Sequence, residues 1–130
     1  MSVLLGQGEF KYRVIEDWAK LPENWSFMDV AGVAVSSKDE IFVFNRGKHP
    51  VIVFDIDGNY LRSWGENLFS RPHGIHIGPD DYIYCTDDGD HTVKKISPDG
   101  KLIFQIGVPG KPSEFMSNLP FHRCTHTALC

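Results

Sequence analysis

The sequence lacks several features that would assign it to common functional classes. Of its 130 residues, 13 are Lys or Arg and 17 are Asp or Glu, and the formal net charge is −4. A nucleic-acid surface needs clustered lysine and arginine, which this chain does not have, so nucleic acid is not expected as a partner. No apolar run approaches the roughly 18 residues of a membrane-spanning helix, so no membrane partner is expected.

Cysteine is also scarce. The chain has three cysteines, Cys85, Cys124 and Cys130, an odd number at uneven spacing. This arrangement fits free thiols in a reducing compartment better than a disulfide framework. The first ten residues show neither the charged start nor the apolar centre of a secretory signal. A cytoplasmic location is therefore expected.

An internal repeat dominates what the sequence does contain. The stretch from Gly32 to Gly65 recurs, without a gap, from Gly74 to Gly107, at a constant spacing of 42 residues. A fixed period near 40 residues is typical of repeat architectures such as the β-propeller, in which each repeat is one blade.

Each copy has the pattern of four short antiparallel strands. In the first copy, runs rich in β-branched and aromatic residues end near 35, 44, 54 and 64, and turn-forming residues separate them. The second copy repeats these runs and keeps the Asp-Gly pair between the last two, a strong hairpin signal. The expected fold is all-β, with two complete four-stranded propeller blades.

The expected organisation follows from this repeat. Residues 1–29 are an N-terminal strand (10–15) and a loop, and 121–130 resemble the first strand of an incomplete third blade. Between them the predicted segments are blade 1 at 30–65, a linker at 66–71, blade 2 at 72–107 and a second linker at 108–120.

Two blades cannot close a ring, because a propeller needs at least about four. Exposed blade flanks would favour association. The chain is therefore expected either to be part of a longer protein or to form a homo-oligomer, for which a trimer with six blades is the favoured arrangement.

Positions at which the two copies differ are the better functional candidates. Arg46 replaces what is Asp88 in the second copy, and a guanidinium at the mouth of a propeller can hold a carboxylate. His73 replaces Ala31 at the start of an innermost strand, and neutral imidazole is a common zinc ligand. Each residue also has a purely structural interpretation: Arg46 as a solvated loop arginine or a member of an inter-blade ion pair, and His73 as a histidine that belongs to no site.

The repeat pattern, with its Gly-Val-Ala-Val, Ile-Phe-Val-Phe and Trp-Gly segments, resembles NHL repeats. More narrowly, Phe44-Asn-Arg-Gly-Lys-His49 together with Arg71-Pro-His-Gly-Ile75 is similar to the peptidyl-α-hydroxyglycine α-amidating lyase group of six-bladed NHL propellers. That resemblance implies a lyase that cleaves a peptidyl-α-hydroxyglycine into a peptide amide and glyoxylate.

The resemblance also implies roles for four residues. Arg46 matches a substrate-binding, catalytic arginine, and His73 matches one of three zinc-binding histidines. Val33 and Ile75 match positions whose backbone oxygens bind a structural calcium. Zinc and calcium are therefore the implied cofactors, and a peptide is the implied ligand.

The remaining residues of that lyase site have no counterpart in this chain, so the resemblance leaves open whether it is an enzyme. We expect it to be inactive alone and to need oligomerisation or further blades. The alternatives are a non-catalytic protein-interaction propeller module and a self-assembling structural unit.

Overall fold

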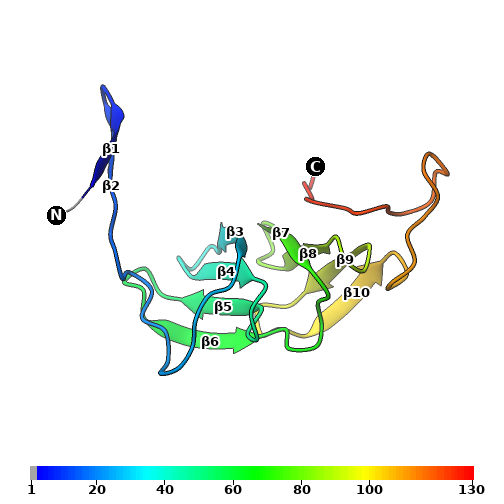
Figure 1. Cartoon of the computed structure of the whole chain (residues 1–130), viewed down its shortest axis with the longest axis horizontal. Helices are drawn as coiled ribbons and strands as arrows, with labels where there is room; N and C mark the ends of the chain where they lie inside the picture. Colours follow the sequence, from blue (N-terminus) through cyan, green and yellow to red (C-terminus); the bar gives the residue numbers. More distant parts are fainter. Residues whose placement is uncertain (1–2) are drawn as a thin grey trace.

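A computed structural model describes residues 3–130, which form strands, turns and loops without helix. They therefore include no helix long and apolar enough to cross a bilayer. The strands make two four-stranded antiparallel sheets and a separate two-stranded hairpin (Figure 1). The predicted all-β fold with two propeller-type blades is confirmed.

Each sheet is a meander in which consecutive strands pair. Blade 1 has the order β3-β4-β5-β6 and blade 2 the order β7-β8-β9-β10. The strands of blade 1 are β3 (Val30–Val35), β4 (Ile41–Asn45), β5 (Val51–Phe54) and β6 (Tyr60–Trp64). Those of blade 2 are β7 (Pro72–Ile77), β8 (Ile83–Asp87), β9 (Thr92–Ile96) and β10 (Leu102–Ile106).

The repeated turn residues have a backbone reason. Asp39 and Asp81 occupy equivalent turns with φ of 59° and 58°, and Gly58 and Gly100 occupy equivalent hairpin turns with φ of 78° and 89°. Aspartate tolerates this left-handed region better than most residues, and glycine enters it without steric cost. The shared Asp and Gly positions therefore shape the turns that set the strand register.

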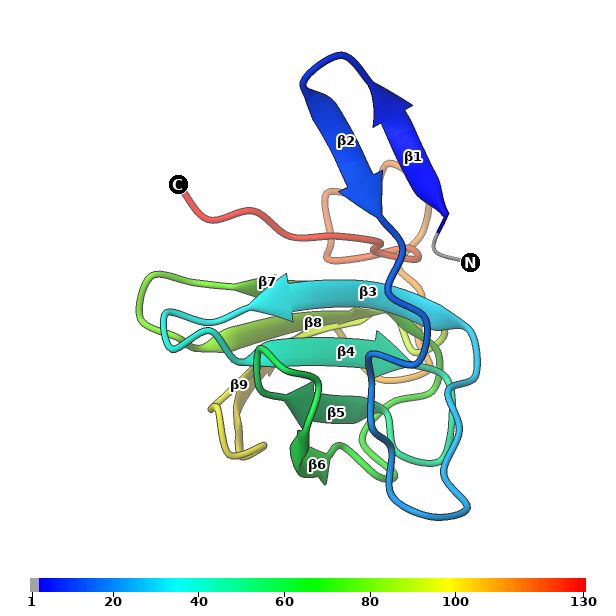
Figure 2. The ribbon, with the colours of Figure 1, turned by 90° about the vertical axis from the view of Figure 1, so that its left-hand side faces the viewer.

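The main core lies between the two blades. Side chains of β4 and β5 on one blade meet side chains of β7, β8 and β9 on the other, and β3 runs beside β7 (Figure 2). The fully or almost fully buried members are Phe42, Phe44, Val51, Val53, Ile75, Ile83, Cys85 and Ile96. This contact fixes how the two sheets face each other.

The other face of blade 1 is covered by the chain itself. Val43, Ile52 and Phe54 point to this face and form a second cluster with apolar residues of the segment 18–27. Trp18 contacts Phe54 at 5.6 Å between ring centroids. The two tryptophans of the segment, Trp18 and Trp25, thus pack against a blade.

The N-terminal strand exists but does not join a blade. β2 (Phe10–Arg13) pairs with β1 (Leu4–Gln7), which the sequence did not predict, and both strands are exposed along their length. This hairpin projects from the two sheets (Figures 1 and 2). The predicted N-terminal segment begins at residue 1, and its first two residues lie outside the described part of the chain.

The prediction that residues 121–130 form the first strand of a third blade is wrong as to strand hydrogen bonds. Residues 121–130 form no strand and pair with no strand of the described chain. They nevertheless run beside β7, where a Cβ added to Gly74 would collide with the Thr125 carbonyl, just as Gly32 closely approaches β7. The segment therefore lies at the position of a third inner strand.

The core between the blades gives the first prediction. Replacing Phe44, which is fully buried and in edge contact with Phe69, by alanine should lower the free energy of unfolding by about 3–5 kcal/mol. Phe115→Ala, at a residue that is 85% exposed, is the matched control and should change it by less than about 0.5 kcal/mol. Denaturant titration of both variants measures the difference, and equal effects would contradict this core.

A pH dependence follows from the ion pair between Glu40 and Arg62. Both Glu40 oxygens accept hydrogen bonds from the guanidinium, at 2.7 and 2.8 Å, and this contact lowers the pKa of Glu40 below its ordinary 4.5. A carboxyl with a lowered folded-state pKa stabilises the fold above its unfolded pKa, and this stabilisation is lost as pH falls through the folded pKa.

We therefore expect the thermal unfolding temperature to decrease as the pH is lowered below about 4.5. Glu40→Gln should have a weaker dependence in this range than the parent chain. Thermal unfolding at pH 3 to 7 tests this, and identical pH profiles for the two proteins would refute it.

Candidate functional site

A hollow of about 310 Å³ opens where the inner strands come together. It is lined by the first halves of β3 and β7 and by the C-terminal segment beside them: Ala31, Gly32, Val33, His73, Gly74, Ile75, Thr125 and His126. Inner strands line the axis of a propeller. We call this cavity the axial hollow.

His73 enters the axial hollow with a defined tautomer. Its Nδ1 lies 3.1 Å from the carbonyl oxygen of Thr125. A carbonyl can only accept, so Nδ1 carries the proton and, in the neutral ring, Nε2 keeps its lone pair. Metal-binding histidines commonly donate one ring N–H to a carbonyl in this way. His73 is thus equipped to act as a single metal ligand.

Arg46 lies next to His73. Its Nε donates to the carbonyl of Pro72, the residue before His73, at 3.1 Å, and its Nη1 is 3.8 Å from an oxygen of Asp29. Its side chain is 28% exposed, and it follows directly on β4. The structure therefore brings the predicted arginine and histidine to the same end of the blades.

Val33 and Ile75 both line the axial hollow, so the structure also brings together the two residues predicted to bind calcium. That their backbone oxygens hold the ion stays a prediction. The sequence interpretation did not pair His126 with His73, yet both line this hollow. The sequence contained a signal for this pairing. A spacing of 52 residues aligns Arg123 with Arg71 and His126 with Gly74, and Gly74 directly follows His73.

The residues present do not complete a zinc site. A catalytic zinc takes three protein ligands, and residues 3–130 contain no group of three His, Cys, Asp or Glu side chains placed to hold a metal. Cys124 does not add a ligand, since its thiol donates to the carbonyl of Thr92 at 3.1 Å and burial raises its pKa. To this hollow His73 offers one potential ligand atom, its Nε2.

An ion pair recurs in both blades with its charges exchanged. In blade 1, Asp29 precedes the inner strand and pairs with Arg46 after β4. At the equivalent positions of blade 2, 42 residues later, Arg71 pairs with Asp88 at 3.4 Å. Arg123, at the same position of the third copy, also pairs with Asp88 at 3.4 Å. Asp88, in the loop after β8, therefore connects the start of its own inner strand, β7, to the C-terminal segment.

Asp88 is the most buried member of these pairs. Its side chain is 7% exposed, whereas those of Arg71 and Arg123 are 46% and 55% exposed. Its Oδ2 meets both guanidinium groups, and its buried Oδ1 has no hydrogen-bond partner among the described residues. A buried carboxylate depends on such partners, because removal from water penalises its charge.

This geometry predicts an effect of neutralising Asp88. Asp88→Asn keeps the shape of the side chain but leaves two neighbouring guanidinium groups without their shared anion. We expect the free energy of unfolding to fall by about 1–2 kcal/mol. Asp57→Asn, in an exposed turn, is the control.

A double-mutant cycle separates charge pairing from simple packing. Arg123→Gln should cost less stability in the Asp88→Asn background than in the parent chain. Additive effects in this cycle would show that the ion pair contributes nothing.

Comparison with known proteins shows which sequences this chain resembles. No established protein-family profile matches the chain. The chain is 32% identical over 119 residues to human NHL repeat-containing protein 3. This alignment covers 85% of the chain and 34% of that protein. It spans about a third of the length of this relative.

Two further relatives carry amidating enzymes in their names. Rat peptidylglycine alpha-amidating monooxygenase is 33% identical over 97 residues, covering 55% of this chain and 10% of that protein. Peptidyl-alpha-hydroxyglycine alpha-amidating lyase 1 of Drosophila melanogaster is 36% identical over 58 residues, covering 42% and 11%. These relatives support an NHL-type, propeller-related family for this chain.

Proposed function

We propose that the two blades of this chain supply part of the ligand-binding face of an NHL propeller of the amidating-lyase-like group. In this proposal Arg46 binds a carboxylate or carbonyl of a peptide ligand, and His73 supplies one metal ligand. The chain is inactive alone, and its site is completed by further blades, from additional chain or from other copies.

The observation that carries this proposal is that Arg46 is bound to the residue next to His73, which lines the axial hollow. His73 keeps Nε2 free by donating from Nδ1, and Arg46 is anchored on the carbonyl just before it. A bidentate guanidinium suits a planar carboxylate. An imidazole with a free nitrogen suits zinc, which would supply Lewis-acid chemistry to a substrate hydroxyl when bound.

The incomplete ligand set is the reason to propose inactivity of the chain alone. Without a group of three potential ligands within residues 3–130, the chain alone cannot hold zinc as a catalytic site requires. Arg46 can still orient a ligand, because its anchor on Pro72 is internal to the two blades.

We also propose a homo-oligomer, which would require two segments of the chain to change position. In a trimer, blade 1 of a second copy would pack beside blade 2, where residues 121–130 already run along β7. The far face of blade 1 is likewise covered by the segment 18–27. A ring of three copies therefore requires both segments to move aside.

Zinc titration of the purified chain tests the proposal. We expect weak binding of zinc chloride, which the histidine ring signals and backbone amide signals in NMR follow. The affinity should fall by at least about tenfold in His73→Ala. His122→Ala is the matched control, because His122 is exposed and bonds to the Ser113 carbonyl outside the hollow. A peptidyl-α-hydroxyglycine should not be cleaved by the chain alone.

The alternatives give different results in the same samples. Turnover by a monomer would overturn the proposed inactivity, and zinc binding that ignores His73→Ala would remove His73 from the site. A folded chain without zinc affinity would favour a protein-interaction module. A discrete trimer in light scattering would favour the self-assembling unit.

A further inference from the structure

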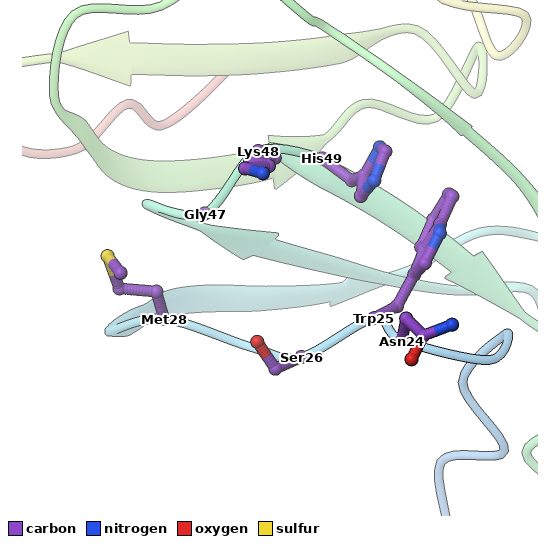
Figure 3. A pocket seen from close by; sticks show the side chains of 7 residues that line it. All are labelled: Asn24, Trp25, Ser26, Met28, Gly47, Lys48 and His49. Atoms are coloured by element: carbon purple, nitrogen blue, oxygen red, sulfur yellow. The ribbon is translucent and has the colours of Figure 1, made fainter.

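A second cavity lies beside Arg46, away from the axis. It has a volume of about 200 Å³ and opens between the segment 24–28 and the turn from β4 to β5. Its lining residues are Asn24, Trp25, Ser26, Met28, Gly47, Lys48 and His49 (Figure 3). We call it the side cavity.

Aromatic stacking holds one wall of the side cavity. The rings of Trp25 and His49 are parallel within 6°, with centroids 3.4 Å apart, and Tyr60 meets Trp25 edge-on at 5.5 Å. Nδ1 of His49 lies 2.8 Å from a carboxylate oxygen of Glu66, which fixes the imidazole plane. The wall is therefore in place before a ligand arrives.

A buried asparagine holds the two sides of the cavity together. Oδ1 of Asn45, a fully buried residue, accepts from the backbone N–H of Gly47 at 2.8 Å and of Met28 at 3.4 Å. The backbone N–H of Arg46 donates to the carbonyl of Met28 at 2.7 Å. A cavity whose sides are joined in this way costs little to order on binding.

The side cavity carries one uncompensated charge. Lys48 is exposed and makes no ion pair among residues 3–130, whereas the nearby Glu66 is engaged by His49 and Asp29 by Arg46. The side chains of Asn24 and Ser26, which line the same cavity on its other side, make no hydrogen bond within the described chain, so their donors are free. A ligand group with negative charge would satisfy all three.

The two cavities lie on either side of Arg46. Arg46 bonds through its backbone to Met28, which lines the side cavity, and through its side chain to Pro72, next to His73 of the axial hollow. Met28 and Ala31, which line one cavity each, are three residues apart. Three residues of chain span at most roughly 10 Å, which limits the separation of the two cavities to about three residues of a bound peptide.

We propose that the side cavity binds the acidic side chain of a peptide whose C-terminal end enters the axial hollow. This rests on the proposed function for the direction of the peptide. At about 200 Å³ the cavity is smaller than the roughly 300–1,000 Å³ of sites that hold a whole small ligand. It therefore fits one side chain, with Lys48 selecting the charge and Asn24 and Ser26 completing the hydrogen bonds.

The test uses three synthetic peptides that end in glycine and differ only three positions before it, where they carry glutamate, glutamine or lysine. Binding to the chain is followed by NMR without zinc. The glutamate peptide should shift the amides of Asn24, Gly47 and Lys48, and should bind about threefold to tenfold more tightly than the glutamine peptide.

Substitutions at Lys48 test the origin of this preference. Lys48→Gln should remove it, and Lys48→Glu should make the lysine peptide the better ligand. Lys38→Gln is the matched control, because Lys38 is an exposed lysine of the β3–β4 turn outside both cavities. Circular dichroism confirms that each variant is folded.

Each other result overturns the inference. Equal binding of the three peptides, no binding at millimolar concentration, shifts confined to other residues, or an unchanged preference in Lys48→Gln would each do so. The outcome is separate from that of the zinc titration. A glutamate preference without zinc binding at His73 would remove the lyase-like proposal alone, and zinc binding without the preference would remove the acidic subsite alone.

Discussion

The apolar contact between the two blades is the constraint on which the rest of the structure depends. Phe42 and Phe44 of one sheet pack against Ile75 and Ile83 of the other, in a core from which water is excluded. Burial of these side chains supplies the main driving force for bringing two repeats together. It also sets the loops that follow β4 and β8 at the same end, where Arg46 and Asp88 lie.

Each blade of a propeller packs against neighbours, and three parts of this chain take such positions. The two blades cover each other, the segment 18–27 covers the far face of blade 1, and residues 121–130 run along β7. The ion pairs follow the same logic, since Asp88 bonds both its own blade and Arg123 beyond it. Packing and charge thus both extend past the boundaries of a single repeat.

The functional candidates lie where repeats differ. Shared positions such as Asp39 and Asp81 shape turns, whereas Arg46 and His73 have no chemical equivalent in the other copy. A scaffold of equivalent strands thereby presents non-equivalent side chains around one axis. This explains how an amidating-lyase-like site and a neighbouring peptide subsite can share one face of the same two blades, as we propose.

The sequence by itself determined the blades, because strand and turn patterns are local and occur twice in register at 42 residues. It also indicated Arg46 and His73. Only the tertiary structure decided how Trp25 and His49 stack, how Asn45 joins two segments, and that residues 121–130 lack a strand partner. These contacts join residues far apart in the chain, and no local periodicity encodes which distant surfaces a loop will cover.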